Sequence, residues 1–169
     1  MRFAAKGFSY IELIFAVAIL ALLATAATPY LEKTIQRKKE AELRENLRDI
    51  RTAIDAYKAA SDAGKIAKNV GDSGYPKQLE DLASGVIDVS SPQKKKLRFL
   101  RSIPADPMFT ANLAYASDLN SSSGINAEST WGKRSYDSEV DSPREGADVF
   151  DVYSLNPQTG LNGVPYQQW

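Results

Sequence analysis

Residues Phe8 to Tyr30 read FSYIELIFAVAILALLATAATPY and form the main apolar block of the 169-residue chain. Glu12 is the one charged residue in this block, and residues 13–27 carry no charge. A helix needs about 20 mostly apolar residues to cross the hydrocarbon core of a bilayer. The sequence therefore predicts a membrane-spanning helix at residues 8–30, provided that a function offsets the cost of the Glu12 carboxylate.

The residues on either side of the block bear on its orientation. Arg2, Lys6 and the initiator amine precede it, and positive charge ahead of an apolar span keeps that end in the cytoplasm. A second basic cluster, residues 37–39, follows the span and favours the opposite orientation, but Glu32 and Glu40 flank it. We therefore expect the rest of the chain to lie outside the cytoplasm.

A cleaved secretory signal peptide is the competing interpretation of the same block. Leu13–Leu23 would be its apolar region, and Ala24-Thr25-Ala26 would be its cleavage site. Glu12 argues against this, because a carboxylate within an apolar span costs about 2.5–3.5 kcal/mol and a signal peptide gains nothing from it. An acidic residue at membrane depth instead predicts a function and a partner for the carboxylate.

The residues around Glu12 resemble a known processing signal. Lys6-Gly7-Phe8-Ser9-Tyr10-Ile11-Glu12 is similar to the class III signal of type IV prepilins and pseudopilins, in which a short basic leader ends in Gly and a Glu follows five residues later. The resemblance implies that a prepilin peptidase removes leader residues 1–7 by cutting between Gly7 and Phe8. It also implies N-methylation of the new Phe8 amine. Gly7 has no Cβ, so a protease can approach its backbone closely.

A partner for Glu12 follows from this cleavage. The new amine of Phe8 is a cation in an apolar setting, either in the same chain or in an adjoining subunit. Buried charges persist only when they are paired. We therefore predict that Glu12 acts in assembly, where it sets the axial register between subunits.

The next segment has the pattern of an amphipathic helix. Apolar residues recur there at spacings of four, three, four and three: Leu43, Leu47, Ile50, Ile54 and Tyr57. This predicts a periplasmic helix at residues 31–62 that ends at Asp62-Ala63-Gly64 and continues the membrane helix. Pro29 predicts a kink or local unwinding near residues 26–30. It either marks the end of the span or, as the resemblance implies, lets the helix extend within a filament.

The remaining chain predicts a small soluble head. Residues 63–130 are a variable loop region with short helices expected at 75–82, where Leu79 and Leu82 point inward, and at 91–100; residues 119–129 are expected to be an exposed loop. Residues 131–136 and 149–154 are expected to be strands of a small sheet in residues 131–169. The predicted fold class is α+β: a long N-terminal helix, half membrane-spanning and half amphipathic, packed on a small antiparallel sheet as in type IV pilins.

The order of later segments extends the resemblance to the major pseudopilins of type II secretion. These segments are Tyr75-Pro76, residues 100–107, Trp131-Gly132 and residues 151–154, with 108–130 unaccounted for. The absence of Cys agrees, since many type IV pilins close their C-terminal region with a disulfide. The resemblance implies a subunit of a periplasmic filament that drives protein export. The implied partners are copies of itself, minor pseudopilins, the prepilin peptidase and an inner-membrane assembly platform.

The calcium site of that family does not carry over to this chain. Residues 155–169 contain no Asp or Glu, and calcium normally needs carboxylate ligands. We therefore expect no cofactor there, and we expect the tail to be held by packing of Pro157, Pro165, Tyr166 and Trp169. An alternative calcium site stays open where carboxylates cluster, at Asp137, Glu139, Asp141, Glu145, Asp148 and Asp151.

Composition argues against other classes of function. The 21 basic and 21 acidic residues balance, so no nucleic-acid partner is expected. The chain has no His and no Cys, which excludes a Ser-His-Asp triad and a cysteine nucleophile, and we expect no enzyme. Two alternatives remain: a type IV pilin of a surface pilus for adhesion or motility, and a soluble periplasmic domain released at Ala26.

Overall fold

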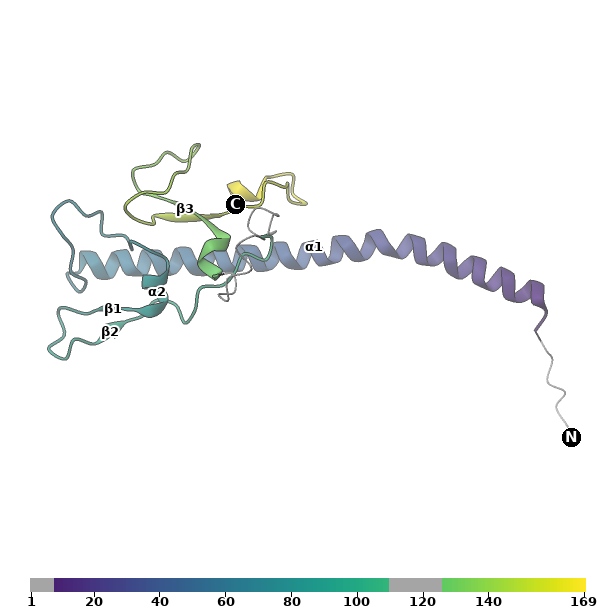
Figure 1. The fold of residues 1–169 in the computed structure, drawn as a ribbon, viewed down its shortest axis with the longest axis horizontal. Helices are drawn as coiled ribbons and strands as arrows, with labels where there is room; N and C mark the ends of the chain where they lie inside the picture. The colour runs from purple at the N-terminus through teal and green to yellow at the C-terminus, as the bar shows by residue number, and fades with distance from the viewer. Residues whose placement is uncertain (1–7, 110–125) are drawn as a thin grey trace, which may run out of the picture. The chain divides into compact units, whose positions relative to one another are not determined.

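The structure, a computed structural model, describes residues 8–109 and 126–169, without the side chains of residues 26–29. Contacts divide the chain into two compact units, Met1–Lys38 and Lys39–Trp169. The fold is α+β, as predicted, and its elements are labelled in Figure 1 where space allows. In chain order they are helix α1 (Tyr10–Asp62), helix α2 (Glu80–Ser84), strands β1 (Val86–Ile87) and β2 (Lys96–Leu97), 3-10 helix η2 (Ala127–Thr130), strands β3 (Trp131–Arg134) and β4 (Asp151–Ser154), and 3-10 helix η3 (Tyr166–Gln168).

Helix α1 ends where the sequence predicts. Gly64 adopts φ +70°, and its N–H donates to the Ser61 carbonyl at 3.0 Å. The N–H of Lys65 donates to the Ala60 carbonyl, also at 3.0 Å. This pair of bonds is the Schellman motif, which satisfies carbonyls at a helix end and favours glycine at the left-handed position.

The unwinding predicted near Pro29 is not observed. Helix α1 is assigned without a break from Tyr10 to Asp62, through residues 26–30. Proline removes only one N–H donor from the helical ladder, and the flanking residues continue the ladder on both sides. The prediction of local unwinding was therefore wrong, while the alternative of a kink stays a prediction.

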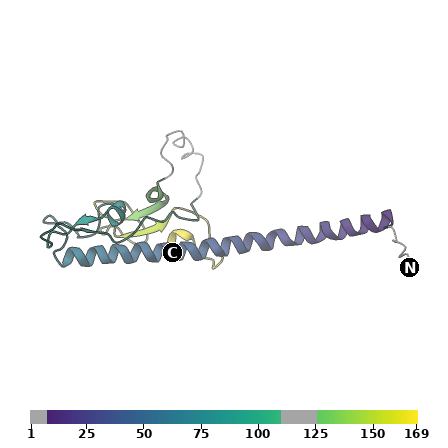
Figure 2. The ribbon, with the colours of Figure 1, turned by 90° about the horizontal axis from the view of Figure 1, so that it is seen from below.

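The apolar stripe of α1 forms the core of the unit Lys39–Trp169. All five of its predicted residues, from Leu43 to Tyr57, are buried. They cluster with side chains in or just before α2, β3 and β4 and with one from the tail. These are Leu79, Leu82, Trp131, Val149, Val152 and Tyr166. Figure 2 shows these elements along one side of the C-terminal half of α1. The helix therefore contributes one face to a hydrophobic core, as its 3.6-residue period predicts.

Strands β3 and β4 confirm the two strands that the sequence predicted, though each is shorter than expected. They pair antiparallel, with Trp131 opposite Ser154 and Arg134 opposite Asp151. Gly132 faces Tyr153 across the ladder, and a Cβ on Gly132 would come within 2.4 Å of the Tyr153 ring. Glycine at this position therefore lets the tyrosine ring lie across the neighbouring strand.

Residues 91–100 do not form the expected helix. They form a turn and strand β2, which pairs antiparallel with β1 through Val86 opposite Leu97. Lys94, with φ +48°, closes the turn, and the N–H of Asp88 donates to the Lys95 carbonyl at 2.8 Å. The β-branched residues before the turn supply a partner strand, and this pairing overrides the helix-start signal of Ser91 and Pro92. The described residues thus form two small sheets where one was predicted.

Two other predictions for the loop region are met in part. Helix α2 begins at Glu80, later than expected, and Leu79 and Leu82 are fully buried as predicted. Residues 119–125 of the predicted loop lie outside the described residues, and residues 127–130 form η2 rather than irregular loop. The Asn126 side chain begins this short helix by accepting a hydrogen bond from the N–H of Glu128 at 3.2 Å.

Candidate functional site

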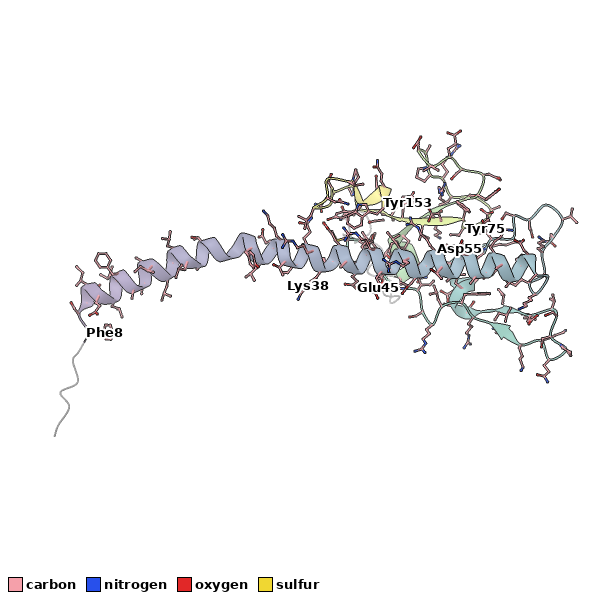
Figure 3. The ribbon with its side chains drawn as sticks, turned by 180° about the vertical axis from the view of Figure 1, so that it is seen from behind. Phe8, Lys38, Glu45, Asp55, Tyr75 and Tyr153 are labelled. Carbon is pink, nitrogen blue, oxygen red and sulfur yellow. The ribbon has the colours of Figure 1, made fainter. Side chains whose placement is uncertain are left out.

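The candidate site is the apolar segment that begins at Phe8. Every described side chain from Phe8 to Thr25 is exposed, and Phe8 itself is 80 % exposed. Figure 3 labels Phe8 at the start of this segment and shows side chains projecting from the helix. Among the described residues, α1 is the one helix long and apolar enough to cross a membrane, and its apolar window is not buried within the chain. The segment is therefore not a core helix of a soluble domain.

Glu12 lies in the first turn of α1, two residues after the helix begins. An acidic residue there interacts favourably with the helix dipole. Ser9 and Glu12 also have the spacing of a capping box, but neither side chain forms a hydrogen bond with a described residue. Within the described residues, the Glu12 carboxylate also has no ion-pair partner. In the described part of the chain, Glu12 is thus an acidic side chain without a partner in an apolar segment.

The other predicted site residues give less information. Gly7 lies outside the described residues, as does the side chain of Pro29. Phe8 precedes α1 by two residues, so the proposed new amine would lie next to the turn that carries Glu12. The structure thus places Phe8 and Glu12 in one neighbourhood and leaves Pro29 within the helix.

A basic cluster follows the apolar segment on α1. Four cations are exposed and form no ion pair with a described residue: Lys33, Arg37, Lys38 and Lys39. Figure 3 labels Lys38 among them. Glu40, which we expected to offset this cluster, is 3 % exposed and turned into the protein instead. Its carboxylate therefore does not neutralise the cluster at the surface.

Glu40 anchors the C-terminal tail to α1. Its Oε1 atom accepts hydrogen bonds from the N–H of Leu161 and the hydroxyl of Tyr166, both at 2.8 Å. The guanidinium of Arg44 lies 3.7 Å from Oε2. Because these partners are separated by more than 120 residues, no local sequence signal identifies Glu40 as an anchor.

Arg51 makes a second anchor from α1 to the tail. It donates to Asp151 Oδ1 at 2.8 Å, to the Val152 carbonyl at 3.1 Å and to the main-chain oxygen of Trp169 at 2.7 Å. The guanidinium of Arg44 stacks on the Trp169 ring, 4.3 Å from its centroid. The tail is therefore held by charged groups of α1 as well as by packing.

The predicted packing of the tail is correct for some residues and wrong for one. Tyr166 is fully buried, and its ring lies 5.1 Å from that of Trp169. Pro165 is half-buried and bridges to Thr159. Pro157, however, is exposed and contributes no packing, because the hydrogen bonds around the buried Asn156 side chain direct the chain outward there.

Two of the six clustered carboxylates are held by protein donors. Asp151 pairs with Arg51 and Arg134, the latter at 3.3 Å. Asp148 accepts hydrogen bonds from Ser73, from the Ser135 hydroxyl at 2.7 Å and from the Tyr136 N–H at 2.9 Å. In the described part of the chain, no three Asp or Glu residues converge as metal ligands. Asp148 and Asp151 are thus bonded within the fold, and the other four carboxylates of the cluster remain on the surface.

Asp148 and Asp106 should influence the acid stability of the protein in opposite directions. Partial burial raises the pKa of Asp148, but hydrogen bonds from Ser73, Ser135 and Tyr136 outweigh it and leave this pKa below its ordinary value. Burial raises the pKa of Asp106, despite hydrogen bonds from Ser154 and Met108. Stability from Asp148 is therefore complete above the unfolded pKa of about 3.9 and is lost as the pH falls toward the folded value. The contribution of Asp106 has the reverse sign and is lost as the pH rises through its folded pKa.

We accordingly predict that Asp148→Asn lowers the free energy of unfolding by about 1–3 kcal/mol at pH 7. It should also make the loss of stability below pH about 4 shallower. Asp106→Asn should act above pH about 4 instead, where it removes the stability that the native chain gains as its Asp106 carboxyl is protonated. Urea unfolding of the full chain in detergent, followed by tryptophan fluorescence from pH 3 to pH 7 (roughly the range over which Asp titrates), measures both slopes. An unchanged slope in Asp148→Asn would contradict the role of its hydrogen bonds.

No protein-family model, curated protein or solved structure matches this chain. The class that the structure defines is an α+β protein with one long N-terminal helix. The first part of that helix is exposed and apolar, and its second part packs against small antiparallel sheets.

Proposed function

We propose that this chain is a membrane-anchored precursor that is cut between Gly7 and Phe8 and then assembles with its own copies into a helical filament. The observation that carries the proposal is the exposure of every described side chain from Phe8 to Thr25. The unit Lys39–Trp169 has a complete core that does not use these side chains. The apolar segment therefore needs an apolar environment that the rest of the chain does not supply.

Two environments meet that need in succession. Lipid surrounds the segment before assembly, and the same segment of other copies replaces lipid in the filament. Contacts between different faces of identical subunits generate an open helical array when the rotation between neighbours does not close into a ring. The role of the protein is then mechanical, and the chain is the substrate of a processing enzyme rather than an enzyme.

Glu12 makes this assembly specific. Its carboxylate has no partner among the described residues, and an unpaired charge is costly at membrane depth. The cleaved amine of Phe8, in the same or an adjoining subunit, supplies the missing cation. A stack of apolar helices alone can slide along the filament axis, whereas this ion pair fixes the axial step between subunits.

Within this class we favour the major pseudopilin of a type II secretion system. This rests on the resemblance of residues 6–12 and of the ordered later segments between residues 75 and 154, with 108–130 unaccounted for, and on the cysteine-free tail, which Glu40 and Arg51 hold in place. The chain would be an inner-membrane protein with a cytoplasmic N-terminus and a periplasmic head until it enters the filament. A type IV pilin of a surface pilus shares the N-terminal features and remains the alternative.

The mature N-terminus tests the proposal against a soluble periplasmic domain. Mass spectrometry of the protein purified from cells should find N-methyl-Phe8 at its start. A chain that begins at Ala27 would lack the apolar segment and would overturn the filament proposal. The place where assembled copies are found then separates the two kinds of filament. Filaments sheared from the cell surface indicate a surface pilus, and filaments recovered from the periplasm indicate a secretion filament.

Processing itself gives a direct prediction. Gly7→Leu should reduce cleavage by about a hundredfold, since a displacement of the scissile backbone by about 1 Å can cost that much. The uncut precursor would then accumulate and run about seven residues larger on a gel. Ser9→Ala, which alters a neighbouring residue beyond the scissile bond, is the matched control and should be cut normally. A mature-sized Gly7→Leu product would contradict the proposed cleavage site.

A further inference from the structure

A groove of about 830 Å³ lies beside the β1–β2 hairpin. Most of its wall is apolar, and lysines stand at its rim; the residues used below are Ile66, Val86, Val89, Pro92, Lys94 and Lys96. Val89 is 54 % exposed, so part of this apolar wall faces the surface. An apolar centre with a charged rim is the arrangement found at protein–protein interfaces.

The positive charge of the hairpin is not neutralised within the described chain. Lys94, Lys95 and Lys96 are exposed and form no ion pair with a described residue. The one carboxylate of the hairpin turn, Asp88, instead accepts hydrogen bonds from the N–H and hydroxyl of Ser90, at 2.9 and 2.5 Å. Hydrogen bonding to Ser90 keeps the Asp88 pKa below its ordinary value. The groove therefore presents a cationic rim that lacks a counter-charge.

The connection between β3 and β4 has the complementary character. It carries four exposed carboxylates that pair with no described cation, at Asp137, Glu139, Asp141 and Glu145. Val140 stands between two of them and is 76 % exposed. In the view of Figure 1 this connection lies above the C-terminal half of α1 and the hairpin lies below it, at the two edges of the layer that Figure 2 shows on one side of the helix. One unit thus carries an acidic patch with an apolar tip on one flank and a basic groove with an apolar wall on the other.

Building on the proposed function, we propose that the β3–β4 connection of one copy docks into the hairpin groove of the next copy. Val140 enters the apolar wall beside Val89, and the carboxylates of Glu139 and Asp141 face Lys94 and Lys96. Opposite charges placed face to face define the register and disfavour like-to-like pairing. Because the two patches differ and lie on opposite flanks, each copy can bind one copy on either side, which continues an open array.

The absence of native cysteine makes this contact testable by disulfide formation in the full chain. A Val89→Cys/Val140→Cys double variant should form a ladder of covalent multimers on mild oxidation, because each chain links to two others. Each single variant can form dimers at most. Val70→Cys/Val140→Cys is the matched control, since Val70 is fully exposed but lies outside the groove. We expect at least about tenfold more multimer from the 89/140 pair than from the control, because docking raises the effective concentration of the two thiols.

Charge reversal supplies the second arm. Lys94→Glu/Lys96→Glu, in the 89/140 cysteine background, should reduce the ladder about tenfold by placing like charges together. Adding Glu139→Lys/Asp141→Lys to the same chain should restore it, because the opposite charges are re-formed with their places exchanged. Failure of restoration would overturn the proposed pairing.

Electron microscopy of the same samples separates this inference from the proposed function. Filaments together with a specific ladder support both. Filaments without a ladder above the control overturn the docking contact and leave the filament proposal standing. If the native chain forms no filaments and no ladder appears, both fall.

Discussion

Glu12→Ala is expected to abolish filaments while cleavage after Gly7 continues. In the structure, the Glu12 carboxylate is exposed in the first turn of α1 and has no partner among the described residues. Removing it would favour the subunit in lipid by about 2.5–3.5 kcal/mol, since a carboxylate at membrane depth costs that much. It would also leave the amine of a neighbouring Phe8 buried without a counter-charge, which costs about 3–5 kcal/mol. Both effects shift the equilibrium from filament to membrane.

Glu12→Gln separates the charge from the local helix geometry. Glutamine can take the same place as glutamate in a capping box with Ser9, so it preserves any stabilisation of the first turn. It cannot neutralise an amine. We therefore expect Glu12→Gln to fail in assembly as Glu12→Ala does. Glu12→Asp should retain part of the ability to assemble.

The measurement combines immunoblotting for the mature size with electron microscopy for filaments. Normal filaments in Glu12→Ala would refute the pairing role. Filaments in Glu12→Gln but not in Glu12→Ala would assign Glu12 to helix capping instead. Loss of cleavage in either variant would indicate that Glu12 acts in recognition by the peptidase.

Glu40→Ala is expected to give the largest loss of stability among the polar substitutions considered. Glu40 is almost fully buried and accepts from both the Leu161 N–H and the Tyr166 hydroxyl. Alanine would remove this acceptor from the hydroxyl of the buried Tyr166 and from the partly buried N–H of Leu161. Loss of a hydrogen bond to a charged, buried acceptor costs about 1.5–3 kcal/mol, so we expect a total loss of about 3 kcal/mol.

Tyr166→Phe is the matched control for Glu40→Ala. It removes one hydrogen bond but keeps the ring in the core against Trp169, so it should cost about 1 kcal/mol. Urea unfolding of the full chain in detergent, monitored by tryptophan fluorescence, gives both values. Limited proteolysis should cut Glu40→Ala after residue 155 at concentrations of protease that leave the parent intact. A parent-like unfolding curve for Glu40→Ala would show that packing alone holds the tail.

The elements that sequence reasoning identified correctly depend on contacts close along the chain. The stripe from Leu43 to Tyr57 repeats every three or four residues, and helical periodicity alone places these residues on one face. The helix end at Gly64 follows from the tolerance of glycine for positive φ. The alternation in residues 149–154 likewise gives strand β4 without knowledge of its partner.

The hairpin at residues 86–97 shows where such reasoning failed. Ser91-Pro92 has the composition of a helix start, and local preference favours a helix at that place. The alternative is a pairing between two segments of two residues each, whose stability comes from each other and from the adjoining core. A preference that is worth a fraction of a kcal/mol per residue yields to such pairing.

The apolar block at residues 8–30, its lone carboxylate and the helical stripe that follows it are properties of the order of residues, because hydropathy and periodicity are local quantities. Tertiary folding alone brings Glu40 to Tyr166 and Arg51 to Trp169, across 126 and 118 residues, and turns Glu40 away from the basic cluster beside it. The Glu40 pair forms because a buried charge needs a partner, and the closed core places both tail residues within reach of α1. Neither the contact of Glu40 with Tyr166 nor its orientation away from the basic cluster can be predicted from the residues next to it in the sequence.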